Sequence, residues 1–509
     1  MEILMNDLSQ QELIPLDNVQ IKIEQKNSVP ANAKKLISVT SQLLGQKIEI
    51  NQNEITVTGE IATRYVFINE FEKYDSEDAT ETFEKKVTVK EYANVNQLFA
   101  NVFLQNSNWR LSENNVLLEN ILMVKIEGIK THNLQVVSDL TGEVEVQKVD
   151  QQILSYHSKL DDKFEVAESI QLDNNCEGVL GLDVNPSLKD VAVNDGKVSF
   201  KGVCYVNVLG VKTVENTTVP YNTVHKIDFA KSIAVNGISG ADFACGDIIV
   251  DAVNMHIENG QQGAVLALTM NLIFSGNVYC NCKFSSIVDA ISFDKELTLR
   301  SRQLNSLEVL PQVNTCVDIE SNINLAPNTP YISHVLAVDN MRVVDLQTNV
   351  TDNKVLLEGV LCVNLLLENE EHLVIGEHFK VPFQTYVRVD GLDRDYTINS
   401  TVIHLIVNVK ARRGVELLVD AQLGVEINGE VKKSITIIDS LEEGATKSDD
   451  GSAIRIYIIG EKESLWDLAK RTNLSCEALL QQNPNLENGC TPGERIVVYK
   501  HENIALYIL

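Results

Sequence analysis

The stretch that decides the fold is Lys354-Val355-Leu356-Leu357-Glu358-Gly359, because two earlier stretches of the chain resemble it. They are Glu54-Ile55-Thr56-Val57-Thr58-Gly59 and Lys197-Val198-Ser199-Phe200-Lys201-Gly202. Residues of these types, in short apolar runs that follow turn signals, are typical of β-strands. A glycine at the end of such a run indicates a bulge or a close backbone approach. We therefore read the three glycines as features that shape a sheet and bind nothing.

The spacing of these stretches indicates three similar domains. The glutamates Glu24, Glu168 and Glu320 lie 144 (168−24) and 152 (320−168) residues apart, and each precedes its glycine by 35, 34 and 39 residues. Another strand pattern begins 57, 63 and 56 residues after each glycine. A repeat of roughly 145 residues is too long for a solenoid repeat and suits a domain with its own core. The sequence thus predicts a mainly β chain with three tandem domains of one fold.

Composition suggests where these domains begin and end. Residues 439–452 are acidic and small, with Leu441 and Ala445 as the only apolar side chains, so they predict a solvated linker. Gln151 to Leu160 shows a helical period between the first two repeats. The expected organisation is an N-terminal segment 1–19, repeats at 20–150, 163–300 and 315–438, the linker 439–452 and a C-terminal module 453–509.

Charge and cysteine content narrow the classes of partner. The chain has 71 acidic and 43 basic residues and a net charge of −28, which argues against binding to nucleic acid or to an anionic membrane. This excess favours solubility, although a basic partner surface would fit it too. We expect neither a signal peptide nor a membrane-spanning helix, since the chain starts without a basic segment and has no long uncharged apolar run. Nine cysteines, an odd number, predict reduced thiols in a cytosol.

Catalytic motifs are missing from the sequence. We find no His-Glu-x-x-His pair, no Gly-x-Ser-x-Gly elbow and no phosphate-binding glycine loop. Cys280 and Cys282 form the only close cysteine pair, with no second pair at zinc-ligand spacing. His404 lies in an apolar strand and is expected in a core. We therefore expect a protein that is not an enzyme and that holds no metal or cofactor.

The last fifty-odd residues follow a different pattern. Residues 454–459 and 495–499 favour strands. Between them Ser464, three residues before Asp467, has the spacing of a helix N-cap, and Ser475 repeats that signal. Asn483-Pro484 ends the second helix. The predicted order is strand, helix, helix, strand.

This pattern resembles the LysM module. The resemblance rests on Tyr457-Ile458-Ile459, Ser464 to Ala469, Leu479 to Pro484 and Pro492 to Ile496. LysM modules usually bind N-acetylglucosamine polymers through two loops, and in this family Trp466 more often packs in the core. The loop residues that the resemblance assigns to partner or glycan binding are Glu461, Lys462, Glu463, Ser464, Leu465, Asn483, Pro484, Asn485 and Leu486.

One departure favours a protein partner over a glycan. Lys462-Glu463-Ser464 stands where LysM modules usually have Gly-Asp-Ser or Gly-Asp-Thr, so a long charged side chain replaces the glycine that lets the backbone approach a sugar closely. We expect Lys462 and Glu463 to give register and selectivity to a protein interface. Leu465, if partly exposed, would be its apolar anchor.

The repeats are similar to SPOCS domains, the β-rich modules of clostridial spore-coat proteins. Three such units and one LysM module resemble the SipL-like spore-coat morphogenesis proteins. This resemblance implies an adaptor in the mother-cell cytoplasm, at the forespore surface, whose LysM module binds the coat morphogenetic ATPase SpoIVA, with other coat proteins as further partners. The alternative is a protein of the spore cortex or cell wall that binds peptidoglycan.

Overall fold

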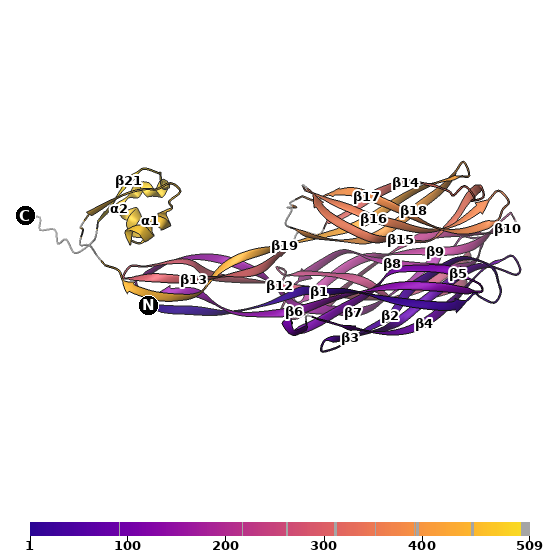
Figure 1. Ribbon diagram of the computed structural model, residues 1–509, viewed down its shortest axis with the longest axis horizontal. Helices are drawn as coiled ribbons and strands as arrows, with labels where there is room; N and C mark the ends of the chain where they lie inside the picture. The colour runs from indigo at the N-terminus through magenta and orange to yellow at the C-terminus, as the bar shows by residue number, and fades with distance from the viewer. Residues whose placement is uncertain are drawn as a thin grey trace, which may run out of the picture.

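The computed structural model describes residues 1–499 except 91, 216, 261–262, 310–312, 352, 391, 393–395, 449–451 and 453. Strands dominate these residues, which confirms the prediction of a mainly β chain (Figure 1). They form three units of two antiparallel sheets each, and every sheet has three strands except one four-stranded sheet in the third unit. A small C-terminal module lies beside the end of the molecule that is away from most of these sheets (Figure 1).

Unit 1 consists of the sheets β1-β6-β5 and β2-β3-β4. Apolar side chains alternate along its strands, so each sheet has one apolar face. The apolar faces of the two sheets pack against each other around Ile55, Val57, Leu122 and Val124. Its elements are β1 (Glu2–Ser28), β2 (Ala33–Asn51), β3 (Glu54–Asn69), β4 (Tyr74–Thr88), the short 3-10 helix η1 (Tyr92–Asn94), β5 (Gln97–Ser112) and β6 (Asn115–Thr141).

Unit 2 repeats this arrangement with the sheets β7-β12-β11 and β8-β9-β10. Its core includes Phe200, Cys204 and Phe274, and the rings of Phe200 and Phe274 stack with centroids 4.4 Å apart. Its strands are β7 (Val144–Gln171), β8 (Cys176–Asn194), β9 (Lys197–Val214), β10 (Thr217–Ala234), β11 (Phe243–Gly260) and β12 (Gly263–Ser292).

Unit 3 has the sheets β14-β19-β18 and β15-β16-β17, with the extra strand β13 on the free end of β19. Its core is the largest of the three clusters and includes Leu361, Val363 and Leu423. Its strands are β13 (Lys295–Val309), β14 (Val313–Asn324), β15 (Ile332–Thr351), β16 (Lys354–Asn369), β17 (Val374–Arg388), β18 (Thr397–Arg412) and β19 (Glu416–Thr446).

The three glutamates and glycines of the sequence pattern occupy matching strands. Each glutamate lies on the strand that pairs with the long strand of its unit: Glu24 in β1, Glu168 in β7 and Glu320 in β14. Each glycine lies on the central strand of a sheet. The strand on one side places a phenylalanine opposite the glycine, and the strand on the other side has a register shift there. The pairs are Gly59–Phe83, Gly202–Phe229 and Gly359–Phe383. A Cβ at these glycines would lie 3.1, 2.4 and 2.9 Å from the ring, so the glycine leaves room for it.

The long strands continue beyond the sheets as three antiparallel ribbons. They pair from Glu2↔Thr141 in the first ribbon, from Val144↔Ser292 in the second and from Lys295↔Thr446 in the third. We call these ribbons the stalk, made of residues 2–15, 127–141, 144–158, 278–292, 295–309 and 430–446, and the rest of the three units the head (Figure 1).

The stalk has its own apolar interior. Val137, Ile287 and Ile438 are buried together, although they lie 150 (287−137) and 151 (438−287) residues apart. Leu140, Ala290 and Leu441 join them three residues further on in each ribbon. Since each ribbon supplies the same positions, the stalk is arranged around an approximate threefold axis. A two-stranded ribbon is marginal in water by itself, and this shared core supports all three.

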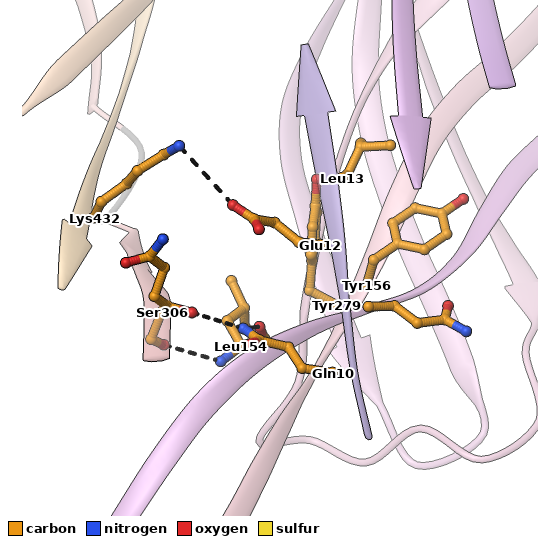
Figure 2. A pocket seen from close by; sticks show the side chains of 10 residues that line it. Gln10, Glu12, Leu13, Leu154, Tyr156, Tyr279, Ser306 and Lys432 are labelled. Carbon is orange, nitrogen blue, oxygen red and sulfur yellow. Dashed lines mark hydrogen bonds and ion pairs between the residues drawn. The ribbon is translucent and has the colours of Figure 1, made fainter. Parts of the chain in front are cut away.

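Hydrogen bonds tie the first strands of the three ribbons together where the stalk meets the head. The Gln11 amide nitrogen donates to Ser155 Oγ at 2.9 Å, and the Leu154 amide nitrogen donates to Ser306 Oγ at 3.3 Å. The Gln10 side-chain amide donates to the Asn305 carbonyl at 2.9 Å (Figure 2). Each bond joins two different units, so the edges of β1, β7 and β13 are partnered at this junction.

The three units also meet inside the head. Val66, Leu209 and Leu366 each lie seven residues after the glycine of their unit (66−59, 209−202, 366−359), and all three are buried in one cluster. Asp339 of β15 is buried beside this cluster and accepts a hydrogen bond from the Ser38 hydroxyl of β2. The interface between units is thus apolar with a buried polar contact.

The C-terminal module follows the order strand, helix, helix, strand. Of the residues that the structure describes, none belongs to a helix with the length and apolar character needed to cross a membrane. The elements of the module are β20 (Ile454–Ile458), α1 (Leu465–Thr472), α2 (Cys476–Gln482), the 3-10 helix η2 (Pro484–Asn488) and β21 (Arg495–Tyr499).

Three local predictions differ from the structure. The expected linker is strand β19 as far as Thr446, because Leu441 packs in the stalk core while Glu442 and Glu443 pair with cations on β13. Residues 151–160 belong to strand β7 and not to a helix, because they pair with β12. Residues 1–19 are no separate segment, since β1 runs through them into unit 1.

Candidate partner-binding site

The C-terminal module is built on a small core between its sheet and its helices. Leu468 and Ala469 of α1, Leu479 of α2 and Ile496 of β21 are fully buried in it. Helix α1 starts at a reciprocal cap: the Asp467 amide nitrogen donates to Ser464 Oγ at 3.2 Å, and the Ser464 amide nitrogen donates to Asp467 Oδ2 at 2.9 Å. The Ser464 bonds hold the pKa of the Asp467 carboxyl below its ordinary value. Ser464 therefore has a structural role at the helix start.

The first predicted loop carries one inward charge, Glu463, and two exposed charges, Glu461 and Lys462. The Glu463 carboxylate accepts from the Gly460 amide nitrogen at 2.7 Å and pairs with Arg471 at 3.1 Å, which leaves its side chain only 13% exposed. Lys462 and Glu461 are exposed, and Lys462 has a left-handed backbone with φ of 61°. Reversing Glu463 would therefore disturb the loop, whereas reversing Lys462 changes surface charge alone.

The second predicted loop is partly a structural element. Asn483 is buried, and its side chain donates to the Val497 carbonyl and accepts from the Val497 amide nitrogen, both at 2.8 Å. Leu486 is buried in the core. Both side chains are thus used inside the module, and their contact with a partner stays a prediction. Pro484 and Asn485 are exposed, and Asn485 binds the Glu494 carboxylate.

Two further side chains of the module pack inward. Leu465 packs against the core and remains partly exposed, so its role as the apolar anchor stays a prediction. Trp466 also packs on this core, as expected, and its indole Nε1 donates to Asp289 Oδ2 of the stalk at 2.9 Å. All nine loop residues remain predicted contacts, and the exposed ones are Glu461, Lys462, Ser464, Pro484 and Asn485.

The most apolar exposed surface of the module was not predicted. Ile454, Ile456 and Ile458 of β20 are 66%, 66% and 57% exposed, and Val497 and Tyr499, their neighbours on β21, are 41% and 38% exposed. The register pairs Ile454 with Tyr499 and Ile456 with Val497, so the five side chains share one face of the sheet. We call these five residues the outer face. Exposed apolar side chains gathered on one face make it a candidate interaction site.

The sequence contained a signal for the outer face. Residues 454–459 are apolar at even positions as well as at Tyr457 and Ile459. A strand with only one buried face would alternate apolar and polar residues. Apolar residues on both faces of a two-stranded sheet therefore indicate a second contact beyond the core of the module.

The sequence singled out three side chains outside the module: Cys280, Cys282 and His404. Cys280 and Cys282 are free thiols, and burial raises the pKa of Cys280 to about 11. His404 is half-buried rather than a core residue; its ring stacks on Tyr205 at 4.9 Å, and burial lowers its pKa. Across the described part of the chain, no three His, Cys, Asp or Glu side chains gather into a metal-binding group.

Comparison with protein families gives a match within unit 3. The family model described as SipL, SPOCS domain matches residues 332–412, which run from the first residue of β15 to the last of β18 in unit 3. No curated protein and no solved structure matches the chain. Unit 3 is thus similar to the SPOCS domain of SipL, and this similarity indicates a sporulation-related role for the chain.

Proposed function

We propose that this chain is a non-enzymatic adaptor of endospore coat assembly. Its C-terminal module, of LysM type, binds the coat morphogenetic ATPase SpoIVA, and the SPOCS-like units tether the coat to the forespore surface in the mother-cell cytoplasm. The match of unit 3 to the SPOCS domain of SipL supports the process. Units 1 and 2 have the same strand order as unit 3, which supports three SPOCS-like domains.

The outer face of the module carries the proposal. Strand β21, which carries Val497 and Tyr499 of this face, lies at the end of the molecule away from the head (Figure 1). The module has five basic and six acidic residues between 454 and 499, a net charge of −1 (5−6), whereas residues 1–453 carry −27 (37−64). An apolar face on a nearly neutral module can approach a protein surface without the repulsion that the acidic head and stalk would impose on an acidic partner.

Substitution in the outer face tests this contact. Ile456→Glu places a charge in its centre and should weaken binding to purified SpoIVA by roughly tenfold or more, since burying an isoleucine side chain is worth about 1.5–3 kcal/mol. Val149→Glu is the matched control, because Val149 is an exposed apolar residue of the stalk. It should bind like the wild type.

The loops give a separate readout. Lys462→Glu should reduce binding to SpoIVA mainly at low salt if the loop contributes charge to the interface. Wild-type affinity for SpoIVA in the Ile456→Glu variant would remove the outer face from the contact. Binding of the module to chitin oligomers, with none to SpoIVA, would instead support a peptidoglycan-binding protein.

A further inference from the structure

The module is fixed to the tip of the stalk by apolar contacts. Ile291 of β12 is buried in the core cluster of the module, and Phe293, in the turn that follows, packs against the same cluster. Residues of two different folding units thus share one core. A module joined only by a flexible connection would have no such shared core.

Polar contacts surround this core on the stalk side. Asn473, the left-handed C-cap of α1, donates to the Phe293 carbonyl and accepts from Lys447 Nζ, both at 2.7 Å. The Glu145 carboxylate of β7 accepts from the Cys476 amide nitrogen at the start of α2 at 2.9 Å. Residues of the stalk, or directly adjoining it in the sequence, therefore supply partners to backbone or cap groups of both helices.

Asp289 of β12 is the centre of the interface. One oxygen accepts from Trp466 Nε1 at 2.9 Å, and the other accepts from the Ala290 amide nitrogen at 2.9 Å and from Lys470 Nζ at 2.5 Å. Both oxygens are thus used, and two of the three donors belong to α1 of the module. Hydrogen bonds with a charged partner are roughly twice as strong as neutral ones.

Another ribbon of the stalk has an aspartate at the equivalent position, and this aspartate does not bind the module. Asp139 lies 150 residues before Asp289 (289−139), and its carboxylate accepts from the Leu140 amide nitrogen at 2.9 Å just as Asp289 accepts from Ala290. Asp139 instead pairs with Lys148 at 2.7 Å. In the third ribbon Ser440, 151 residues after Asp289 (440−289), takes this position. Of these three equivalent positions in the approximately threefold stalk, Asp289 is the one that binds the module. The side chain at this position therefore determines which ribbon the module docks on.

We propose that Asp289 latches the module to the stalk, so that head, stalk and module form one rod with a fixed orientation of the module. The latch covers the Trp466 and Lys470 side of α1 and leaves the outer face and Lys462 exposed. A partner bound to the outer face would then be held at a set angle and distance from the head. That last consequence rests on the proposed function, whereas the latch itself can be tested without any partner.

Trp466 is a direct probe of the latch. The chain has two tryptophans, so Trp109→Phe leaves Trp466 as the single reporter. In this background Asp289→Ala removes the acceptor and Lys470→Ala removes the donor from the module side. The matched control is Asp139→Ala. Fluorescence quenching of Trp466 by acrylamide reports its exposure, and small-angle X-ray scattering reports whether the module leaves the rod.

Both latch variants should release the module more readily. The ratio of docked to undocked molecules should fall roughly tenfold or more, as expected for the loss of a hydrogen bond to a charged group. Trp466 should become accessible to acrylamide at lower urea, while the urea midpoint of the strand signal in circular dichroism stays at the wild-type value. Asp139→Ala should change neither.

The proposal is overturned if Asp289→Ala and Lys470→Ala both leave the exposure of Trp466 and the scattering profile unchanged across the urea series. It is also overturned if Asp139→Ala raises the exposure of Trp466 as much as Asp289→Ala, since the effect would then be a general loosening of the stalk. SpoIVA is absent from these measurements, so failure of the proposed function would not alter their outcome.

Discussion

Replacing Asp339 by asparagine should stabilise the protein at neutral pH. Asp339 is buried where the units meet, and its carboxylate accepts a hydrogen bond from the Ser38 hydroxyl. Burial raises the pKa of this carboxyl from its ordinary value of 3.8 to about 6, although the Ser38 bond and the charge of Arg64 oppose that rise. The charged form is thus held in the fold at a cost, which an uncharged amide avoids while it can still accept from Ser38.

The size and the sign of the effect follow from linkage. Below about pH 3.8 the carboxyl is protonated in both states, so it costs nothing. As the pH rises to about 6, the unfolded chain loses its proton first and stability falls. Above that pH the full cost is present, about 3 kcal/mol at roughly 1.4 kcal/mol for each pKa unit. Asp339→Asn should raise the free energy of unfolding by up to this amount at about pH 7.5, and by less than about 1 kcal/mol at about pH 4.

Urea unfolding followed by circular dichroism, at several pH values between these limits, measures the difference. Asp228→Asn is the control, because the Asp228 side chain is 80% exposed and pairs with Lys189 at 3.1 Å. Its effect should stay within about 0.5 kcal/mol at every pH. An Asp339→Asn variant that is less stable than the wild type at about pH 7.5, or whose gain does not depend on pH, would refute the reasoning.

Two further substitutions test the packing that joins and shapes the units. Ile287→Ala, in the stalk core, should lower the free energy of unfolding by about 2–4 kcal/mol, whereas Val149→Ala on the stalk surface should change it by less than about 0.5 kcal/mol; chemical denaturation of both variants checks this. Gly359→Ala puts a methyl group 2.9 Å from the Phe383 ring and should cost about 1–3 kcal/mol, compared with less than about 1 kcal/mol for Gly178→Ala, where the nearest atom is 3.8 Å away. Equal losses in either pair would contradict the packing described for it.

The strand pattern was the most predictable part of the fold. Residues 54–59, 197–202 and 354–359 all lie at the start of a central strand, as their composition and turn signals indicate. The sequence suggested a bulge or a close approach at Gly59, Gly202 and Gly359, and the structure shows a register shift in one neighbouring strand and a ring from the other. The glycine and the ring belong to different strands, and the pairing of these two strands brings them together.

The composition of the sequence did not reveal the stalk. Residues 439–446 have the small and acidic character of a linker, yet they form strand because Leu441 meets Leu140 and Ala290 from the other ribbons. One apolar side chain in such a stretch is a weak signal, and its partners Ala290 and Leu140 lie 151 (441−290) and 301 (441−140) residues away. Tertiary contacts of this kind override local composition.

In the module, the sequence located the elements better than the roles of the loop residues. The N-caps at Ser464 and Ser475 are present, because a hydroxyl before an apolar stripe is a local signal. Burial of Asn483 depends on its contact with Val497 across the module, which local pattern does not reveal. Docking through Asp289 involves a residue of another unit and was likewise beyond a local pattern.

Capture of SpoIVA by the full chain, compared with a chain that ends at residue 447, tests the proposed adaptor role most directly. The shortened chain retains all strands of the head and the stalk, and circular dichroism can verify that they remain folded. Immobilised full-length protein should retain purified SpoIVA, and the shortened protein should retain none above background. Equal capture by the two proteins would contradict the account, because SpoIVA would then bind the head or the stalk rather than the C-terminal module.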